Sequence, residues 1–545
     1  MLRGLALNGF PAVSRPSESD RLLAALRKPA CYPHAAGAVD LIETHISWVF
    51  LAGDYAYKIK KPVSLGFLDF STLEKRRFYC EEELRLNRRT APGLYLDVVP
   101  VAESRDGLRV GGTGKAIEFA LRMRRFPQEA LADSLARCGK LGAAEVDAIA
   151  AAIAAFHATV PAAALDAEFG SPELVTAPAL ANFEQLGRLV VDPAEGAQLA
   201  GLRAWTLSES SRLHEAFAAR KRDGFVRECH GDLHLGNVAF VDGRPVPFDC
   251  IEFDPKLRWI DVMNEVAFLA MDLLEHGLAA AAWRFLNAYL ETTGDYAGVR
   301  VLRYYLVYRA MVRAMIACIR LHQPGAGEAA QGRAHREYGE YLALAGSLAA
   351  SERRALVVMH GLSGSGKTTV AQKMSESLGA VRVRSDVERK RLHGLAAGAR
   401  THARAFGGIY APEATRLTYQ RLRQAARDVV ESGYDVIVDA AFLRRAEREE
   451  FRALAQELGA SFLIVSCRAP EAALRSRLAH REAMMSDASE AGVTVLENQL
   501  ATQEPLGDDE LSHAALIDTE RGEAGLEGAI RGIASHLDAA RTSHG

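Results

Sequence analysis

The segment GLSGSGKTT at residues 361–369 has the composition and spacing of a phosphate-binding loop. It follows the apolar run ALVVMH and leads into TVAQKMSESLG, so the sequence predicts a strand, a tight loop and a helix. In the pattern G-x-x-x-x-G-K-[ST], glycines let backbone N–H groups converge on an anion, and the helix N-terminus adds partial positive charge. The sequence therefore predicts a site for the phosphates of ATP.

The residues of this loop are expected to bind the nucleotide and its metal ion. Lys367 is expected to reach the β- and γ-phosphates, and the Thr368 hydroxyl is expected to bind Mg²⁺. The residues expected around the nucleotide are Gly361, Ser363, Gly364, Ser365, Gly366, Lys367, Thr368 and Thr369. The alternative is a purely structural glycine-rich turn, and the flanking strand and helix argue against it.

Three further residues downstream of the loop could take part in phosphoryl transfer. Asp386 follows the strand-like run AVRVRS, and Asp439 ends the run VIVD. Open α/β sheets bind ligands at the carboxyl ends of their strands, so Asp386 is expected to orient or deprotonate an acceptor hydroxyl and Asp439 to support Mg²⁺. Arg477, on a helix where a lid would lie, is expected to neutralise charge on the transferred group; the alternative is a solvated basic helix.

A second set of residues lies in HGDLHLGN at 230–237 and in the later segment PFD. Phosphoryl transfer needs a carboxylate near the acceptor hydroxyl and oxygen ligands that hold Mg²⁺ on the phosphates. Asp232 is the expected base, with Asn237 and Asp249 as the expected metal ligands.

This second set resembles the catalytic loop of the aminoglycoside phosphotransferase and choline kinase families, which share the protein-kinase-like fold. The resemblance implies that Lys58 in YAYKIKK is the strand lysine of that fold, with Lys60 as its alternate on the same strand face. It also implies an ion-pair partner on the following helix. Counting back from the helix end favours Glu82, and a shift to Glu81 or Glu83 stays open.

The resemblance also assigns residues to the nucleotide in the amino-terminal half. Thr44 and Ser47, in the segment THIS, occupy the place of the first hairpin, which covers the phosphates. Met123 is expected near the hinge that holds adenine.

Two other interpretations concern side chains around the catalytic loop. Cys229, His230 and His234 suggest a metal cluster, but no fourth ligand with suitable spacing follows them. In the kinase-like interpretation, His230 braces the loop through hydrogen bonds, and Asp261 supports the loop rather than binding substrate.

The carboxy-terminal half resembles small P-loop kinases of the gluconate kinase, chloramphenicol phosphotransferase and polynucleotide kinase type. The two halves together resemble bacterial bifunctional aminoglycoside phosphotransferase/ATP-binding proteins. The expected fold is an α+β bilobal protein-kinase-like domain at 1–350, with a β lobe at about 1–125 and a helical lobe at about 126–350. An α/β P-loop domain with a parallel sheet is expected at 351–545, where strand-like and helical segments alternate.

Composition sets the remaining expectations. The chain has 545 residues, a net charge of −3 and seven cysteines without a C-x-x-C pair, a pattern typical of a reduced, cytoplasmic protein. No secretory signal or membrane span is expected. The charge argues against a protein that coats nucleic acid.

These observations predict ATP and Mg²⁺ as cofactors and a small molecule with a hydroxyl group as the acceptor. A protein or nucleic-acid end stays open as the acceptor because the 382–404 region is rich in arginine. A second alternative makes the P-loop half a nucleotide-gated regulatory module. The sequence does not indicate the oligomeric state.

Overall fold

The computed structural model describes residues 18–64, 68–104, 107–322, 327–397, 399, 408–484 and 492–542. The chain divides into two compact units. The β-rich unit consists of Met1–Leu131, Ala239–Asp242 and Val246–Leu257. The larger unit consists of Ala132–Val238, Gly243–Pro245 and Arg258–Gly545.

One antiparallel sheet, with strand order β1-β2-β3-β6-β4-β5, forms the centre of the β-rich unit. Side chains alternate between the faces of a strand, so Tyr57 and Ile59 of β3 join the apolar core beneath α1, while Lys58 and Lys60 of the same strand reach Glu83 of α2. The alternation thus separates a core face from a charged face. The elements are α1 (Glu18–Leu26), β1 (Val39–Glu43), β2 (Ser47–Ala52), β3 (Tyr55–Lys60), α2 (Leu73–Asn87), β4 (Tyr95–Ser104), β5 (Gly107–Val110) and β6 (Lys115–Arg124).

The larger unit begins with a helical part, residues 132–350 apart from the segments that belong to the β-rich unit. Its helices are α3 (Ala132–Arg137), α4 (Ala143–Thr159), α5 (Pro172–Leu189), α6 (Pro193–Arg222), α8 (Val262–Glu275), α9 (Ala279–Thr293), α10 (Val299–Leu321) and α11 (Glu328–Ala350). Between α6 and α8 the chain forms β7 (Val226–Glu228), β8 (Val238–Val241), β9 (Arg244–Pro247), α7 (Pro255–Arg258) and β10 (Trp259–Asp261).

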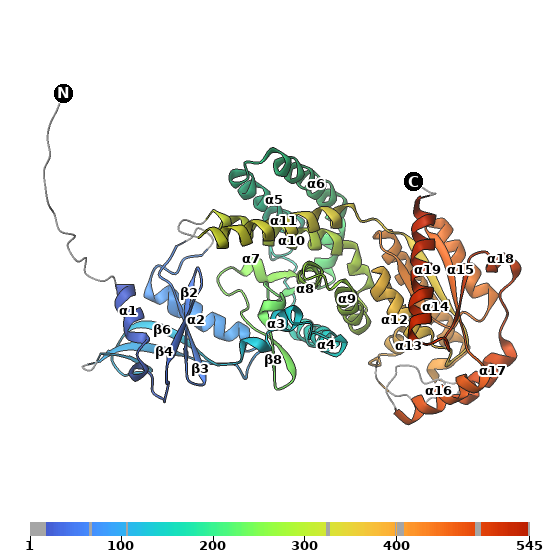
Figure 1. Ribbon diagram of the computed structural model, residues 1–545, viewed down its shortest axis with the longest axis horizontal. Helices are drawn as coiled ribbons and strands as arrows, with labels where there is room; N and C mark the ends of the chain where they lie inside the picture. Colours follow the sequence, from blue (N-terminus) through green and yellow to red (C-terminus); the bar gives the residue numbers. More distant parts are fainter. Residues whose placement is uncertain are drawn as a thin grey trace. The chain divides into compact units, whose positions relative to one another are not determined.

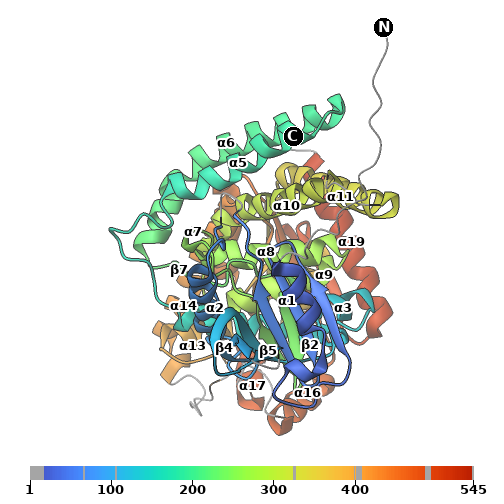
Figure 2. The ribbon, with the colours of Figure 1, turned by 90° about the vertical axis from the view of Figure 1, so that its left-hand side faces the viewer.

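Helix α8 is the centre of this helical part. Its residues from Val262 to Leu273 are all buried, because α4, α9 and α10 pack around it or on its neighbours. Helices α5 and α6 run side by side, as do α10 and α11 (Figure 2). A helix that is apolar on nearly every side must be surrounded in this way.

The P-loop part, residues 351–542, contains a parallel sheet with strand order β12-β13-β11-β14-β15. Helices α12 and α19 cover one face of the sheet, and α14 and α15 cover the other (Figure 1). The predicted parallel sheet is confirmed. The elements are β11 (Ala355–His360), α12 (Lys367–Leu378), β12 (Val381–Arg384), α13 (Ser385–Leu392), α14 (Pro412–Glu431), β13 (Val436–Asp439), α15 (Arg445–Glu457), β14 (Ser461–Arg468), α16 (Glu471–Met484), α17 (Val493–Thr502), α18 (Asp508–Leu511), β15 (Ala514–Asp518) and α19 (Gly522–Thr542).

The predicted domain boundary near residue 350 lies inside the larger compact unit, which holds both the helical part and the P-loop part. As a boundary between functional domains it stays a prediction. Within the described residues, no helix combines the length and apolar character needed to cross a membrane.

Candidate active sites

The loop between β11 and α12 has the backbone of a phosphate-binding loop. Gly361, Gly364 and Gly366 have φ values of 141°, 81° and 84°, a region that favours glycine. A Cβ atom at Gly361 would lie 2.5 Å from the carbonyl oxygen of Cys467, and one at Gly364 would lie 2.9 Å from that of Leu474. The local geometry therefore requires glycine at both positions.

The first residue of α12, Lys367, folds back over this loop. Its Nζ donates a hydrogen bond to the carbonyl oxygen of Leu362 at 2.8 Å. Ser365 is buried and its hydroxyl has no hydrogen-bond partner within the described chain, while Thr369 is exposed. The nucleotide contacts expected of these residues stay predictions.

One backbone N–H of the loop is already bound to a side chain. Ser363 donates its N–H to Oε1 of Gln499 on α17, at 2.8 Å. The sequence analysis missed Gln499, because the contact joins residues that are far apart in the chain. The Gln499 side-chain oxygen thus occupies a backbone N–H of the loop that could otherwise donate to a phosphate oxygen.

Asp439, the last residue of β13, has one open oxygen beside the loop. Its side chain is 4% exposed, its Oδ1 accepts a hydrogen bond from the Thr368 hydroxyl at 3.4 Å, and its Oδ2 has no hydrogen-bond partner among the described residues. Burial raises the pKa of Asp439, while nearby arginines and Lys367 oppose that shift. An open carboxylate oxygen next to a hydroxyl fits a hard divalent cation such as Mg²⁺.

A cavity of about 690 Å³ connects these residues to the expected base. Lys367, Thr368, Asp386, Asp439 and Arg477 all line it. Asp386 is half-buried in the first turn of α13, just beyond the end of β12. The structure therefore brings together the predicted phosphate, metal, base and arginine residues of the P-loop half.

Arg477 is tied to the phosphate loop itself. It donates to the carbonyl oxygen of Gly364 at 3.2 Å and to the Thr519 hydroxyl at 2.9 Å, and it pairs with Glu520. These bonds anchor α16 to the loop. Its expected contact with the transferred phosphoryl group stays a prediction.

In the larger unit, Asp232 and Asn237 of the HGDLHLGN segment are joined directly. The Asn237 side-chain amide donates to the carbonyl oxygen of Asp232 at 2.9 Å and to its Oδ2 at 3.1 Å. Burial opposes ionisation, but His234, His230 and Arg309 outweigh it and lower the pKa of Asp232. Asp232 is therefore ionised at neutral pH, as an expected proton acceptor must be.

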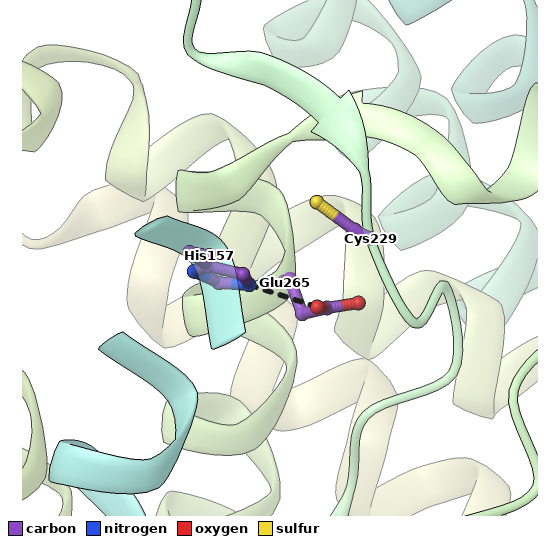
Figure 3. Close-up of side chains that lie close together, drawn as sticks. All are labelled: His157, Cys229 and Glu265. Atoms are coloured by element: carbon purple, nitrogen blue, oxygen red, sulfur yellow. Dashed lines mark hydrogen bonds and ion pairs between the residues drawn. The ribbon is translucent and has the colours of Figure 1, made fainter. Parts of the chain in front are cut away.

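The backbone of this loop is held by Glu265 of α8. Its carboxylate accepts the N–H of His230 at 3.1 Å and that of Gly231 at 2.6 Å. Nε2 of His157 lies 2.9 Å from the same carboxylate (Figure 3). The other ring nitrogen of His157, Nδ1, lies 2.9 Å from the Tyr289 hydroxyl. Sequence analysis missed Glu265, although its position one turn into a buried helix is a usable signal.

His157, Cys229 and Glu265 lie close enough to suggest a metal site (Figure 3). Both nitrogens of His157 and both oxygens of Glu265 are already engaged, and the Cys229 thiol faces the carbonyl oxygen of Ile260 at 3.5 Å. The cluster is therefore a structural brace for the loop. Of the three residues whose types suggested zinc in the sequence, Cys229 alone belongs to it.

The prediction that Asp261 supports the catalytic loop is wrong. Asp261 caps α8 by accepting the N–H of Met263 at 2.8 Å, and it pairs with the buried Arg220. The loop is held instead by Glu265 and by Asp272, which accepts the N–H of Leu235 at 2.8 Å.

A buried charge cluster connects β3 to α2 in the β-rich unit. Lys58 lies 2.8 Å from Glu83 and 2.5 Å from Asp249. Lys60 lies 2.7 Å from the other oxygen of Glu83 and also pairs with Glu252. Burial opposes the charge of Lys58, but Asp249 and Glu83 outweigh it and raise the pKa of Lys58.

The favoured partner of Lys58, Glu82, is wrong by one residue, and Glu83, one of the two alternatives left open, is the partner. Glu82 pairs with Arg85 at 2.7 Å on the outer side of α2. Arg76, Cys80, Glu83 and Asn87 form the buried stripe of that helix. Because this spacing follows one face of a helix, Glu83 points to β3 and Glu82 does not.

Three other expected nucleotide residues are placed in the β-rich unit. Thr44 and Ser47 form the turn between β1 and β2, where the Thr44 hydroxyl accepts the N–H of Ser47 at 2.9 Å. Ser47 is fully buried. Met123 pairs with Ala56 on one side and Tyr95 on the other near the end of β6. Contacts of Thr44, Ser47 and Met123 with a nucleotide stay predictions.

Comparison with known proteins gives two family matches along the chain. Residues 76–305 match the phosphotransferase enzyme family, and residues 356–506 match an AAA domain. An uncharacterized protein of Mycobacterium tuberculosis is 30% identical over 451 residues, which is 83% of this chain and 88% of that protein. A protein of Mycobacterium bovis matches to the same extent.

The chain belongs to the family of these mycobacterial proteins. Its kinase-like phosphotransferase domain precedes a P-loop kinase domain, so the protein is a kinase or phosphotransferase that carries out ATP-dependent phosphoryl transfer. Lys58 precedes the matched range of the phosphotransferase family, and its assignment depends on the structure of β3 and α2.

Solved structures resemble each half distantly. A gluconokinase from Sinorhizobium meliloti is 20% identical with a TM-score of 0.25, covering 34% of this chain and 99% of its own. A choline/ethanolamine kinase family protein from Mesorhizobium loti is 13% identical with a TM-score of 0.34, covering 60% of this chain and 99% of its own. The family assignment does not depend on either likeness.

Proposed function

We propose that this protein is a kinase with two nucleotide sites, each of which uses ATP and Mg²⁺ to phosphorylate a hydroxyl group of a small molecule. The observation that carries the proposal is the cavity in the P-loop part, which Lys367, Thr368, Asp439 and Asp386 line together. A cavity of about 690 Å³ has the size of a small-molecule site.

At the P-loop site, the acceptor hydroxyl oxygen forms a bond to the γ-phosphorus as the bond from that phosphorus to the β–γ bridging oxygen breaks, and ADP leaves. Asp386 takes the hydroxyl proton. Lys367 and the loop N–H groups hold the phosphates, since catalysis of this reaction consists mainly of positioning and charge stabilisation.

Thr368 and Asp439 would hold Mg²⁺ at the P-loop site. When bound, the ion neutralises charge on the phosphates. The open Oδ2 of Asp439 supports this assignment, because a buried carboxylate oxygen without a partner is otherwise costly.

At the kinase-like site, we propose Asp232 as the proton acceptor and Asn237 and Asp249 as the residues that would hold Mg²⁺. The lowered pKa of Asp232 supports its role, because the carboxylate is ionised at neutral pH. Lys58, fixed by Glu83, is proposed to bind the phosphates.

The arginines of the 382–391 segment form bonds within the protein or are buried, which disfavours a nucleic-acid end as the acceptor. Arg382 and Arg384 pair with Glu291, Arg389 is buried, and Arg391 donates to the carbonyl oxygen of Thr292 at 3.2 Å. Each of these arginines is thus already bonded or buried within the protein, and Arg384 and Arg389 line the P-loop cavity. Two further arginines of the region, Arg400 and Arg404, lie outside the described residues.

The experiment that tests the proposal is a screen of hydroxylated metabolites for ADP release by the full-length chain. Asp232→Asn and Asp386→Asn should each abolish turnover of a different set of acceptors. Turnover that depends on Asp232 alone, with ATP bound but never consumed at the P-loop, would favour the regulatory-module alternative. No turnover with any small molecule would overturn the proposal for both sites.

A further inference from the structure

The P-loop site has a charged neighbour that comes from the helical part of the same compact unit. Glu291 of α9 pairs with Arg382 and Arg384 of β12. Nη1 of Arg384 lies 3.4 Å from Glu291, and its Nε lies 3.8 Å from Oδ2 of Asp439. The exposed fractions of the Arg384, Glu291 and Asp439 side chains are 14%, 15% and 4%. Arg384 is thus shared between a carboxylate of the helical part and one of the P-loop part.

The arginine faces the oxygen that Mg²⁺ would need. Oδ2 of Asp439 makes no hydrogen bond within the described chain, and Arg384 is within ion-pair distance of it. Arginine and carboxylate form strong two-point hydrogen bonds when nothing else restrains them. A full pair between Arg384 and Asp439 would occupy the open oxygen.

Helix α9, which carries Glu291, is bonded on two sides. The side-chain amide of Asn287, one turn earlier on α9, donates to the carbonyl oxygen of Ala380 at 3.0 Å and accepts the N–H of Arg382 at 2.7 Å. Tyr289, between them in sequence, contacts His157 in the core of the helical part. Helix α9 is therefore bonded on one side to β12 and on the other to the core of the helical part.

We propose that Glu291 is a positioning residue for the P-loop site. By binding Arg384, it keeps this guanidinium from closing on Asp439, so that Oδ2 stays open for a divalent cation. The inference deepens the proposed function and rests on nucleotide and Mg²⁺ binding at the P-loop. It gives the kinase-like half a direct part in preparing the second site.

The test measures the Mg²⁺ concentration that gives half-maximal ADP binding to the full-length chain. The P-loop component is the part of the binding that Lys367→Ala removes. Glu291→Gln should raise this Mg²⁺ midpoint about tenfold, the low end of the loss seen when a residue that orients a metal ligand is removed. In an Arg384→Gln background, Glu291→Gln should leave the midpoint unchanged, because the competing guanidinium is gone.

Arg284→Gln is the matched control on the same helix. Arg284 pairs with Glu376 of α12 at 2.8 Å, so this variant also removes an ion pair between α9 and the P-loop part. It should leave the Mg²⁺ midpoint unchanged. An equal rise in Arg284→Gln would mean that packing of α9, rather than the charge of Glu291, sets the midpoint, and the inference would be overturned.

The remaining outcomes separate this inference from the proposed function. Mg²⁺-dependent ADP binding in the unaltered protein with an unchanged midpoint in Glu291→Gln would overturn the inference alone. No Mg²⁺-dependent binding in the unaltered protein would overturn both. Should Glu291→Gln fail to fold, Arg384→Gln decides: a higher midpoint in that variant would mean that Arg384 holds Asp439 in a useful position, which contradicts the inference.

Discussion

Lys58 and Glu83 form an ion pair of 2.8 Å in which the Glu83 side chain has no solvent exposure. The same carboxylate binds Lys60 through its other oxygen. Burial raises the pKa of Glu83, but the two lysines outweigh it and lower that pKa to about 2. Glu83 is therefore charged throughout the neutral range, and it shares the neutralisation of the two lysines with Asp249 and Glu252.

Replacing Glu83 should destabilise the β-rich unit far more than replacing its neighbour. Glu83→Gln leaves two buried lysines short of a negative partner, and the loss of one partner of a buried pair costs about 3–5 kcal/mol. Glu82→Gln breaks only a half-exposed pair, which contributes about 0–1 kcal/mol. Hydrogen exchange in α2 and β3, measured by mass spectrometry, compares the two variants. Equal protection in both would contradict the assignment of Glu83.

Asp232→Asn should lower phosphoryl transfer by the kinase-like half roughly 10²–10⁴-fold, the usual effect of removing a positioned proton acceptor. Because asparagine keeps the side-chain volume, nucleotide binding should change little. Steady-state rates and ADP affinity of the full-length variant measure both. The rate is measured with an acceptor whose turnover is unaffected by Asp386→Asn, so that only the kinase-like site is followed. If Asp232→Asn retains the full rate with that acceptor, Asp232 is not the proton acceptor.

Calorimetric titration with ATP and Mg²⁺ should find two sites in the unaltered chain. Lys367→Ala should remove the P-loop site, because that side chain lies over the phosphate loop. Lys58→Ala should remove the other site. If each variant loses both sites, the sites are coupled, and by linkage the effect on affinity must be reciprocal. A single site in the unaltered chain would refute the two-site proposal.

The stability of the larger unit should fall as the pH rises above neutral through the titration of His276. Hydrogen bonds with Asp133 and Glu275 raise the pKa of His276 to about 10, from about 6.5 in an unfolded chain. Between these values the folded state binds a proton that the unfolded state lacks, so unfolding becomes easier as pH increases. The melting-temperature difference between the unaltered chain and His276→Gln should be largest below pH ~6.5 and should shrink toward pH ~10. A difference that grows with pH would reverse the sign and refute the assignment.

The features that could be predicted from the sequence are those that depend on residues close together in the chain. The glycines of the phosphate loop, the helix that begins at Lys367 and the carboxylate at the end of β13 depend on neighbouring residues, and all were predicted. The Lys58 partner was missed by one residue, because the buried stripe of α2 is set by tertiary packing as well as by distance from the helix end.

The features that could not be predicted from the sequence depend on contacts between residues far apart in the chain. Glu265 and Gln499 act on loops far away in the chain, and Glu291 reaches β12 across the junction between the two halves. Each of these is a polar residue on a helix, with no local pattern that names its partner. Only the packing of helices on loops and strands reveals the partners of these residues.

The bonds between Asn287 and β12 have a consequence for the solubility of the chain. β12 is the outermost strand on its side of the parallel sheet. Along the outer edge of that strand, the Asn287 amide binds the carbonyl oxygen of Ala380 and the N–H of Arg382. Unpaired strand edges are templates for aggregation. The P-loop part expressed without α9 should therefore self-associate through β12. In the full-length chain, Asn287 of α9 occupies this edge and prevents that association.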